Sequence, residues 1–220
     1  MNLNLNQLFF DFCRELGERK HLLTEDNIRY YWFAQMLKQD QVLDHYCLED
    51  KYSGLSQIPG KSELDLHYEN GTDDFRFEMK MHLNASHTIP ETQNAGEVFN
   101  DLQRLQSMPA GRKFFLYVTD EVMNRYYGGD AGGRKSSVVY ERALKKVFML
   151  SAGGRTIFSL SEHDAPAGFW KKANDTIKTS GQSILVGLGL LYFSQLYCQA
   201  ANDASSPDGT LYVRLFEVIK

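Results

Sequence analysis

Hydrophobic residues follow two different periods along this chain, and these periods predict where helices and strands lie. The first is a spacing of three to four residues, typical of a helix with one buried face. Thr24 is a candidate N-cap for one such helix, because Glu25 and Asp26 follow in the first turn, where the helix dipole favours acids. Helical spacing is found in residues 3–16, 24–36, 93–107, 137–150 and 170–179.

A period of two predicts a β-hairpin in the first half of the chain. The expected strands are residues 63–68 and 75–82, and residues 69–74 between them are rich in turn formers. Residues 113–119 form a continuous apolar run, which favours a strand buried on both faces.

The second half of the chain offers further strand candidates. Residues 155–160 have strand character, whereas residues 183–198 fit either a long strand or a helix. The polar loop 201–209 separates that segment from the strand-like residues 211–219. We therefore expect a C-terminal antiparallel hairpin.

Helices that alternate with strands predict an α/β fold with a central mixed β-sheet flanked by helices. The length of 220 residues corresponds to one domain, which we expect to span 1–220. An apolar fraction of 43% suffices for a hydrophobic core and excludes a disordered chain.

The net charge of −4 argues at first against a polyanionic partner such as nucleic acid. The charge is distributed unevenly, however. Residues 1–133 carry 13 basic and 21 acidic side chains, whereas residues 134–178 carry 9 basic and 4 acidic ones. A positive middle segment can mark a surface that binds a polyanion, although chance clustering on a solvated face is the alternative.

The cysteines and the apolar runs favour a cytoplasmic protein with no membrane partner. The three cysteines, Cys13, Cys47 and Cys198, are far apart in sequence and have neither disulfide-framework nor zinc-knuckle spacing. The first 20 residues lack the pattern of a signal peptide. The longest apolar run, residues 184–193, is about half of the roughly 20 residues that a membrane span needs.

The predicted hairpin gathers charged side chains on one face. With a period of two, Glu63 and Asp65 project from one face of the first strand, and Glu78 and Lys80 from one face of the second. A two-residue turn would pair Glu63 with Glu78, whereas a four-residue loop over 70–73 would pair Asp65 with Glu78. Either register brings two carboxylates side by side.

Two adjacent carboxylates repel each other unless a cation or a proton lies between them. Hard oxygen ligands of this kind favour Mg²⁺, with Mn²⁺ as an alternative. Lys80, two residues after Glu78, points to the same place and could orient or help to deprotonate a metal-bound water. The combination predicts metal-assisted hydrolysis of a phosphodiester.

The run ELD at residues 63–65, followed after a turn by FEMK at 77–80, resembles the PD-(D/E)XK nuclease superfamily, which has the restriction-endonuclease-like fold. A helix and a further strand follow the lysine strand in that family, as they are expected to do here. The order of elements matches over roughly residues 20–120, and we expect the nuclease-like core to span about 20–160. The literal proline–aspartate pair is absent.

The resemblance implies a role for each residue of the motif. Asp65 and Glu78 would bind the metal with help from the Met79 carbonyl, and Lys80 would position the attacking water. Glu25, on the preceding helix, would support the metal through water. Glu63 competes with Asp65 for the place of the first acid and stays an alternative metal ligand.

Simpler interpretations exist for these residues. Asp65, Glu78 and Lys80 could form a solvated face with ordinary surface ion pairs, each contributing about 0–1 kcal/mol. An acid at position 25 needs no role beyond the helix dipole. Some relatives place accessory polar residues on the following helix, but ordinary helix-surface chemistry is the simpler interpretation there. The residues concerned are Asp101, Gln103 and Arg104.

Basic residues of the positive segment are candidates for contacts with a phosphate backbone. They are Arg134, Lys135, Arg142, Lys145 and Lys146. Solubility alone could also explain them.

The sequence thus predicts a Mg²⁺-dependent nuclease, a hydrolase whose foremost partner is DNA and which could act as a homodimer or with a partner subunit. The alternative is a catalytically inactive nuclease-like domain that binds nucleic acid or a protein partner.

Overall fold

The computed structural model describes residues 3–18, 23–51, 63–83, 90–108, 111–128, 137–150, 154–160, 163–172, 183–187, 194–197 and 210–219. The helices are α1 (Leu5–Gly17), α2 (Glu25–Gln39), α3 (Glu91–Ser107), α4 (Glu121–Gly128), α5 (Val138–Phe148) and α6 (Ala167–Trp170). The strands are β1 (Tyr46–Asp50), β2 (Leu64–Glu69), β3 (Asp74–His82), β4 (Arg112–Thr119), β5 (Arg155–Ser159), β6 (Ser183–Gly187), β7 (Ser194–Tyr197) and β8 (Thr210–Ile219).

The strands form one mixed sheet in the order β1-β2-β3-β4-β8-β6-β5, and β7 also pairs with β8. β1, β2 and β3 make an antiparallel meander, whereas β4 runs parallel to β3. Parallel neighbours need a crossover connection, and α3 lies within it. β8 pairs antiparallel with β4, and β6 and β5 extend the sheet beyond β8.

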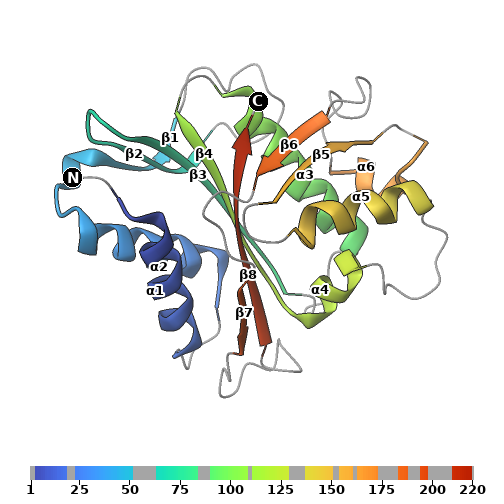
Figure 1. The fold of residues 1–220 in the computed structure, drawn as a ribbon, viewed down its shortest axis with the longest axis horizontal. Helices are drawn as coiled ribbons and strands as arrows, with labels where there is room; N and C mark the ends of the chain where they lie inside the picture. Colours follow the sequence, from blue (N-terminus) through green and yellow to red (C-terminus); the bar gives the residue numbers. More distant parts are fainter. Residues whose placement is uncertain are drawn as a thin grey trace.

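Helices cover both faces of this sheet, with α1 and α2 on one face and α3, α5 and α6 on the other (Figure 1). Side chains of β3 alternate between the two faces. Phe77 contacts Trp32 of α2, with ring centroids 5.6 Å apart, whereas the neighbouring Glu78 pairs with Arg104 of α3. Glu78 therefore faces α3, on the opposite side of the sheet from Phe77.

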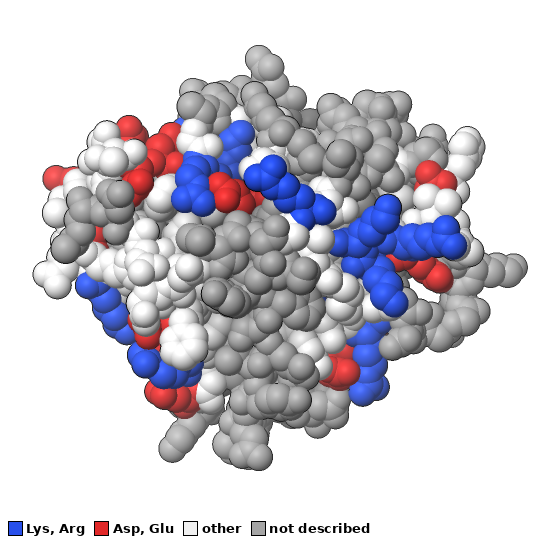
Figure 2. Space-filling model, in the orientation of Figure 1, with Lys and Arg blue, Asp and Glu red and all other residues white. Residues whose placement is uncertain are grey.

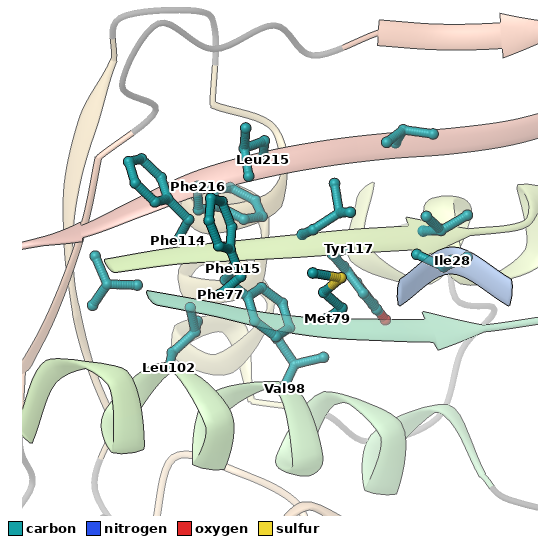
Figure 3. Packing of buried hydrophobic residues seen from close by; sticks show 14 of the residues in the cluster. Ile28, Phe77, Met79, Val98, Leu102, Phe114, Phe115, Tyr117, Leu215 and Phe216 are labelled. Carbon is teal, nitrogen blue, oxygen red and sulfur yellow. The ribbon is translucent and has the colours of Figure 1, made fainter. Parts of the chain in front are cut away.

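Aromatic side chains make up much of the core around the central strands. Phe77 stacks on Phe114 with ring centroids 5.2 Å apart, and on the other face Tyr117 lies 5.7 Å from Phe148. In Figure 3, Val98 projects from α3 towards the sheet, where buried side chains of β3, β4 and β8 meet. The hairpin is thus anchored in the aromatic core.

Several predicted elements are confirmed, and with them the α/β class. The Thr24 side chain accepts a hydrogen bond from the backbone N–H of Asn27, and the Asn27 side chain accepts one from the N–H of Thr24, so Thr24 caps α2 as expected. β4 is buried from Lys113 to Thr119. The ladder of the hairpin ends at the pair Glu69–Asp74, so its loop is the four-residue one over 70–73.

Other expectations were wrong. Strand β1 and helix α4 were not predicted. Three of the five residues of β1 are exposed, so this edge strand lacks the alternation that marks a half-buried strand. Helix α6 ends at Trp170 rather than beginning there, while 173–179 lies outside the described residues. The described residues of segment 183–198 form neither one long strand nor a helix, because they make up two short strands, β6 and β7. The expected C-terminal antiparallel pairing is nevertheless confirmed, since both strands pair antiparallel with β8.

Among the described residues, no helix combines the length and the apolar character needed to cross a membrane.

Candidate active site

Asp65 of β2 and Glu78 of β3 are almost fully buried, with 2% and 1% of their surface exposed. The hairpin ladder pairs Leu66 with Phe77, so Asp65 and Glu78 lie one residue beyond it on either strand. A solvated face with ordinary surface ion pairs is therefore the wrong interpretation. Buried carboxylates need cations or hydrogen-bond donors close by.

Asp65 contacts a hydrogen-bond donor on β3 and a cation on α2. Its Oδ2 accepts a hydrogen bond of 2.7 Å from the backbone N–H of Met79, and its Oδ1 lies 3.2 Å from Nε of Arg29 in α2. The first contact holds the carboxylate beside the backbone of β3, next to Glu78. The second ties the strand to the first turns of α2.

Arg29 also binds Glu25, one helical turn earlier, at 3.1 Å. Burial alone would lower the pKa of Arg29, but the carboxylates of Asp65, Glu25 and Asp26 raise it above the ordinary value. The guanidinium therefore stays charged and links the helix acid to the strand acid. Sequence reasoning missed this arginine, although a spacing of four residues from Glu25 is the signal of an ion pair on a helix.

Lys80 joins the same group of side chains. Its Nζ lies 3.6 Å from Oε2 of Glu25, which also accepts a 3.5 Å hydrogen bond from the backbone N–H of Met81. Burial acts to lower the pKa of Lys80, but Asp101, Glu25, Glu97 and Asp65 outweigh it, so the pKa is raised. The lysine is thus an ammonium ion at neutral pH.

Glu78 pairs with Arg104 of α3 in an ion pair whose two side chains are 2% and 3% exposed. Burial raises the pKa of Glu78 well above its usual range, and the Arg104 guanidinium opposes that shift. The second carboxylate oxygen, Oε1, is buried and has no hydrogen-bond partner. Such an oxygen is costly unless a donor or a cation binds it.

Asp101 shares this arginine, because its Oδ1 lies 3.3 Å from the same nitrogen of Arg104 that binds Glu78. The simple helix-surface interpretation of α3 is therefore wrong, since Asp101, Gln103 and Arg104 are all buried. A sequence signal exists for Asp101: it precedes Leu105 by one turn and so borders the apolar stripe of the helix.

Glu63 does not join the pair. It precedes β2, is partly exposed, and lies 3.7 Å from the ammonium of Lys51. Because the hairpin has the four-residue loop, Asp65 and not Glu63 is in register to meet Glu78. The other residues form one cluster, the acidic centre, which consists of Glu25, Asp65, Glu78 and Asp101 with Arg29, Lys80 and Arg104.

The oxygen donors of the acidic centre are of the type that Mg²⁺ takes. No group of three or more His, Cys, Asp or Glu side chains in the described ranges has the arrangement of a metal site. Both strand acids, Asp65 and Glu78, instead form ion pairs with arginines. The unpartnered Oε1 of Glu78 nevertheless leaves a donor for a cation, and Mg²⁺ fits two carboxylates when water and substrate supply its other ligands.

A basic groove lies apart from this cluster, between α5 and β5. It is lined by the exposed cations Arg142, Lys145, Lys146 and Arg155 together with Met149 and Leu150. Figure 2 shows the Lys and Arg side chains gathered over α5. Arg155 was missed by sequence reasoning, and Arg134 and Lys135 lie outside the described residues.

No family model, curated protein or solved structure matches this chain.

Proposed function

We propose that the chain is a metal-dependent nuclease that hydrolyses phosphodiester bonds, foremost in DNA. The observation that carries this proposal is the acidic centre. Asp65 and Glu78 are buried side by side, and Arg29 connects Asp65 to Glu25, which in turn contacts Lys80. These are the four residues that the resemblance to the PD-(D/E)XK nucleases selects.

The order of elements also supports the proposal. Helix α2, the antiparallel strands β2 and β3, helix α3 and the parallel strand β4 come in the order that the superfamily has, with β1 inserted between α2 and β2. We therefore propose a restriction-endonuclease-like fold, with Asp65 as the first acid.

In this proposal Asp65 and Glu78, with the Met79 carbonyl, hold Mg²⁺ or Mn²⁺, and Glu25 supports it through water. When bound, the metal would supply Lewis-acid polarisation of the phosphate and a lowered pKa for water. The protein contributes the positions of the oxygen atoms that would bind the metal. The Met79 N–H fixes Asp65 on one side and the packing of α3 confines Glu78 on the other.

Lys80 acts in this proposal as a hydrogen-bond donor and not as a base. The surrounding carboxylates raise the pKa of Lys80, so the ammonium form persists at neutral pH. Its three N–H groups can hold a water and a phosphate oxygen in line, while Glu25 restrains the side chain.

The basic groove supports a polyanionic substrate. Arg142, Lys145, Lys146 and Arg155 make no ion pair with any described residue, so their charge is available to phosphates. Because Cys13 and Cys47 form no disulfide among the described residues, we also propose a cytoplasmic location.

The proposal is tested by cleavage of plasmid and single-stranded DNA with Mg²⁺ or Mn²⁺, with RNA as a parallel substrate. Glu78→Gln and Lys80→Ala should each lower the rate at least about 100-fold. Glu69→Gln, on the exposed end of the same hairpin, and Lys38→Ala, on the surface of α2, are matched controls. Equal cleavage by the wild type and all four variants would refute the proposal.

One observation favours a second candidate, a nuclease-like domain that binds nucleic acid or a protein partner without cutting. Both strand acids already form an ion pair with an arginine, Asp65 with Arg29 and Glu78 with Arg104. Salt-sensitive retention of DNA by the basic groove, with no cleavage and no metal binding in calorimetry, would support this candidate.

A further inference from the structure

The charges of the acidic centre do not balance. When all of these groups are ionised, four carboxylates, those of Glu25, Asp65, Glu78 and Asp101, face three cations, Arg29, Lys80 and Arg104. The unpartnered oxygen also belongs to this centre, because Oε1 of Glu78 is buried without a hydrogen bond. An added cation would therefore balance the charge and would also give Oε1 of Glu78 a partner.

The two arginines are held very differently. Arg29 lies within 4 Å of four carboxylates, at 3.1 Å from Glu25 and Asp26, 3.2 Å from Asp65 and 3.8 Å from Glu49. The ion pairs of Arg104 involve only two carboxylates, and both Glu78 and Asp101 meet the same guanidinium nitrogen. Arg104 is the cation that can change partner at the smaller cost.

We propose that Arg104 is a built-in counter-cation that occupies Glu78 while the metal is absent and transfers to Asp101 when Glu78 takes up a divalent cation. Two cations cannot share one buried carboxylate without strong repulsion, because the interior screens charges poorly. Asp101 lies 3.3 Å from the same guanidinium nitrogen, so the transfer requires no new partner. This inference rests on the proposed metal site at Asp65 and Glu78.

The role is one of positioning, since Arg104 acts through Glu78. It gives the protein a closed, charge-paired resting centre and weakens metal binding, because each binding event must break an ion pair. Arg104→Gln removes the competing charge and should tighten Mn²⁺ binding about tenfold or more, the range in which neighbours of metal ligands act. Arg104→Lys keeps the charge and should bind Mn²⁺ as weakly as the wild type.

The measurement is calorimetric titration of the full chain with Mn²⁺, after circular dichroism has verified that each variant is folded. Asp101→Asn is an independent variant, because it removes the second partner of Arg104 and should weaken Mn²⁺ binding. Its matched control is Glu97→Gln, which also removes a carboxylate near Lys80 but does not touch Arg104. Glu97→Gln should leave the affinity within about threefold of the wild type.

The outcomes separate this inference from the proposed function. If Glu78→Gln abolishes Mn²⁺ binding but Arg104→Gln leaves it unchanged or weaker, the metal site stands and the role of Arg104 is refuted. If Arg104→Gln does not fold, an Asp101→Asn affinity equal to that of Glu97→Gln refutes the role. If neither the wild type nor Arg104→Gln binds Mn²⁺, the proposed metal site fails and the inference fails with it.

Discussion

The acidic centre and the basic groove are both clusters of charge, but they are built in opposite ways. In the acidic centre every cation lies within 4 Å of a carboxylate, and Asp65, Glu78 and Arg104 are at most 3% exposed. In the basic groove the four cations are exposed, and no described carboxylate pairs with them.

This difference separates residues that stabilise the fold from residues that are available to bind a ligand. Removing one charge from the acidic centre leaves its partner buried and unpaired, which is costly in a poorly screened interior. Removing one charge from the basic groove exposes nothing new, because water already solvates the cations. We expect mutations in the centre to change stability and chemistry together, and mutations in the groove to change affinity alone.

The largest effect should come from Arg104→Ala, which leaves Glu78 buried without its counter-charge. We expect the free energy of unfolding to fall by about 3–5 kcal/mol. The matched control is Arg125→Ala, because Arg125 also pairs with a helix acid, Glu121 at 2.8 Å, but has a side chain 64% exposed. An exposed pair of this kind contributes about 0–1 kcal/mol.

Urea denaturation of both variants at neutral pH measures these energies. Equal losses for Arg104→Ala and Arg125→Ala would contradict the assignment of the acidic centre as a buried, charge-paired cluster. Glu78→Gln combined with Arg104→Ala should recover part of the loss, because the double variant no longer leaves Glu78 as a buried, unpaired charge.

For the basic groove we expect the opposite, namely a loss of DNA affinity with little change in stability. The triple variant Arg142→Ala, Lys145→Ala and Lys146→Ala should change the free energy of unfolding by no more than about 0.5 kcal/mol per site. Binding of duplex DNA should weaken, and the slope of log affinity against log salt should become shallower by about 0.9 for each phosphate that the variant no longer neutralises.

A control of equal charge makes this prediction specific to the groove. Arg14, Lys38 and Lys51 have side chains that are 62%, 63% and 81% exposed and lie outside the groove. Their triple alanine variant removes the same net charge. If both triple variants lose the same affinity, the binding follows overall charge and the groove has no special part in it.

The hairpin could be predicted from sequence because its signals are local. Alternation gave strands close to the observed ones, and it left two registers that differ only in loop length. The choice between them came from the observed pairing of Glu69 with Asp74, which no local signal supplies. The capping of α2 by Thr24 was predictable for the same reason, since the cap and its partner are three residues apart.

The cations of the acidic centre could not be predicted in the same way. Arg29 and Arg104 reach Asp65 and Glu78 across 36 and 26 residues of chain, and these contacts depend on how α2 and α3 pack on the sheet. Helical periodicity predicts which face of a helix is apolar, but not which charged residue at its border is buried. Arg155 was missed likewise, because it enters the groove only through the packing of α5 beside β5.

Glu97 is more exposed than the strand acids Asp65 and Glu78 and less exposed than the cations of the groove, and it should show a modest effect that depends on pH. A hydrogen bond with His82 and an ion pair with Lys172 lower the pKa of Glu97 to about 2, although burial opposes this shift. A carboxylate whose pKa is depressed by folding stabilises the protein above its unfolded pKa of 4.5, and the contribution is lost as the pH falls towards the folded value.

Because the Glu97 side chain is 22% exposed and Lys172 lies near the surface, we expect a contribution on the order of 1 kcal/mol. Wild type and Glu97→Gln should therefore differ by a constant amount above pH 4.5 and converge as the pH falls to about 2. Urea denaturation across this range measures the difference. A gap that widens in acid would mean that Glu97 gains its stabilisation in the protonated form, which would contradict the assigned contacts with His82 and Lys172.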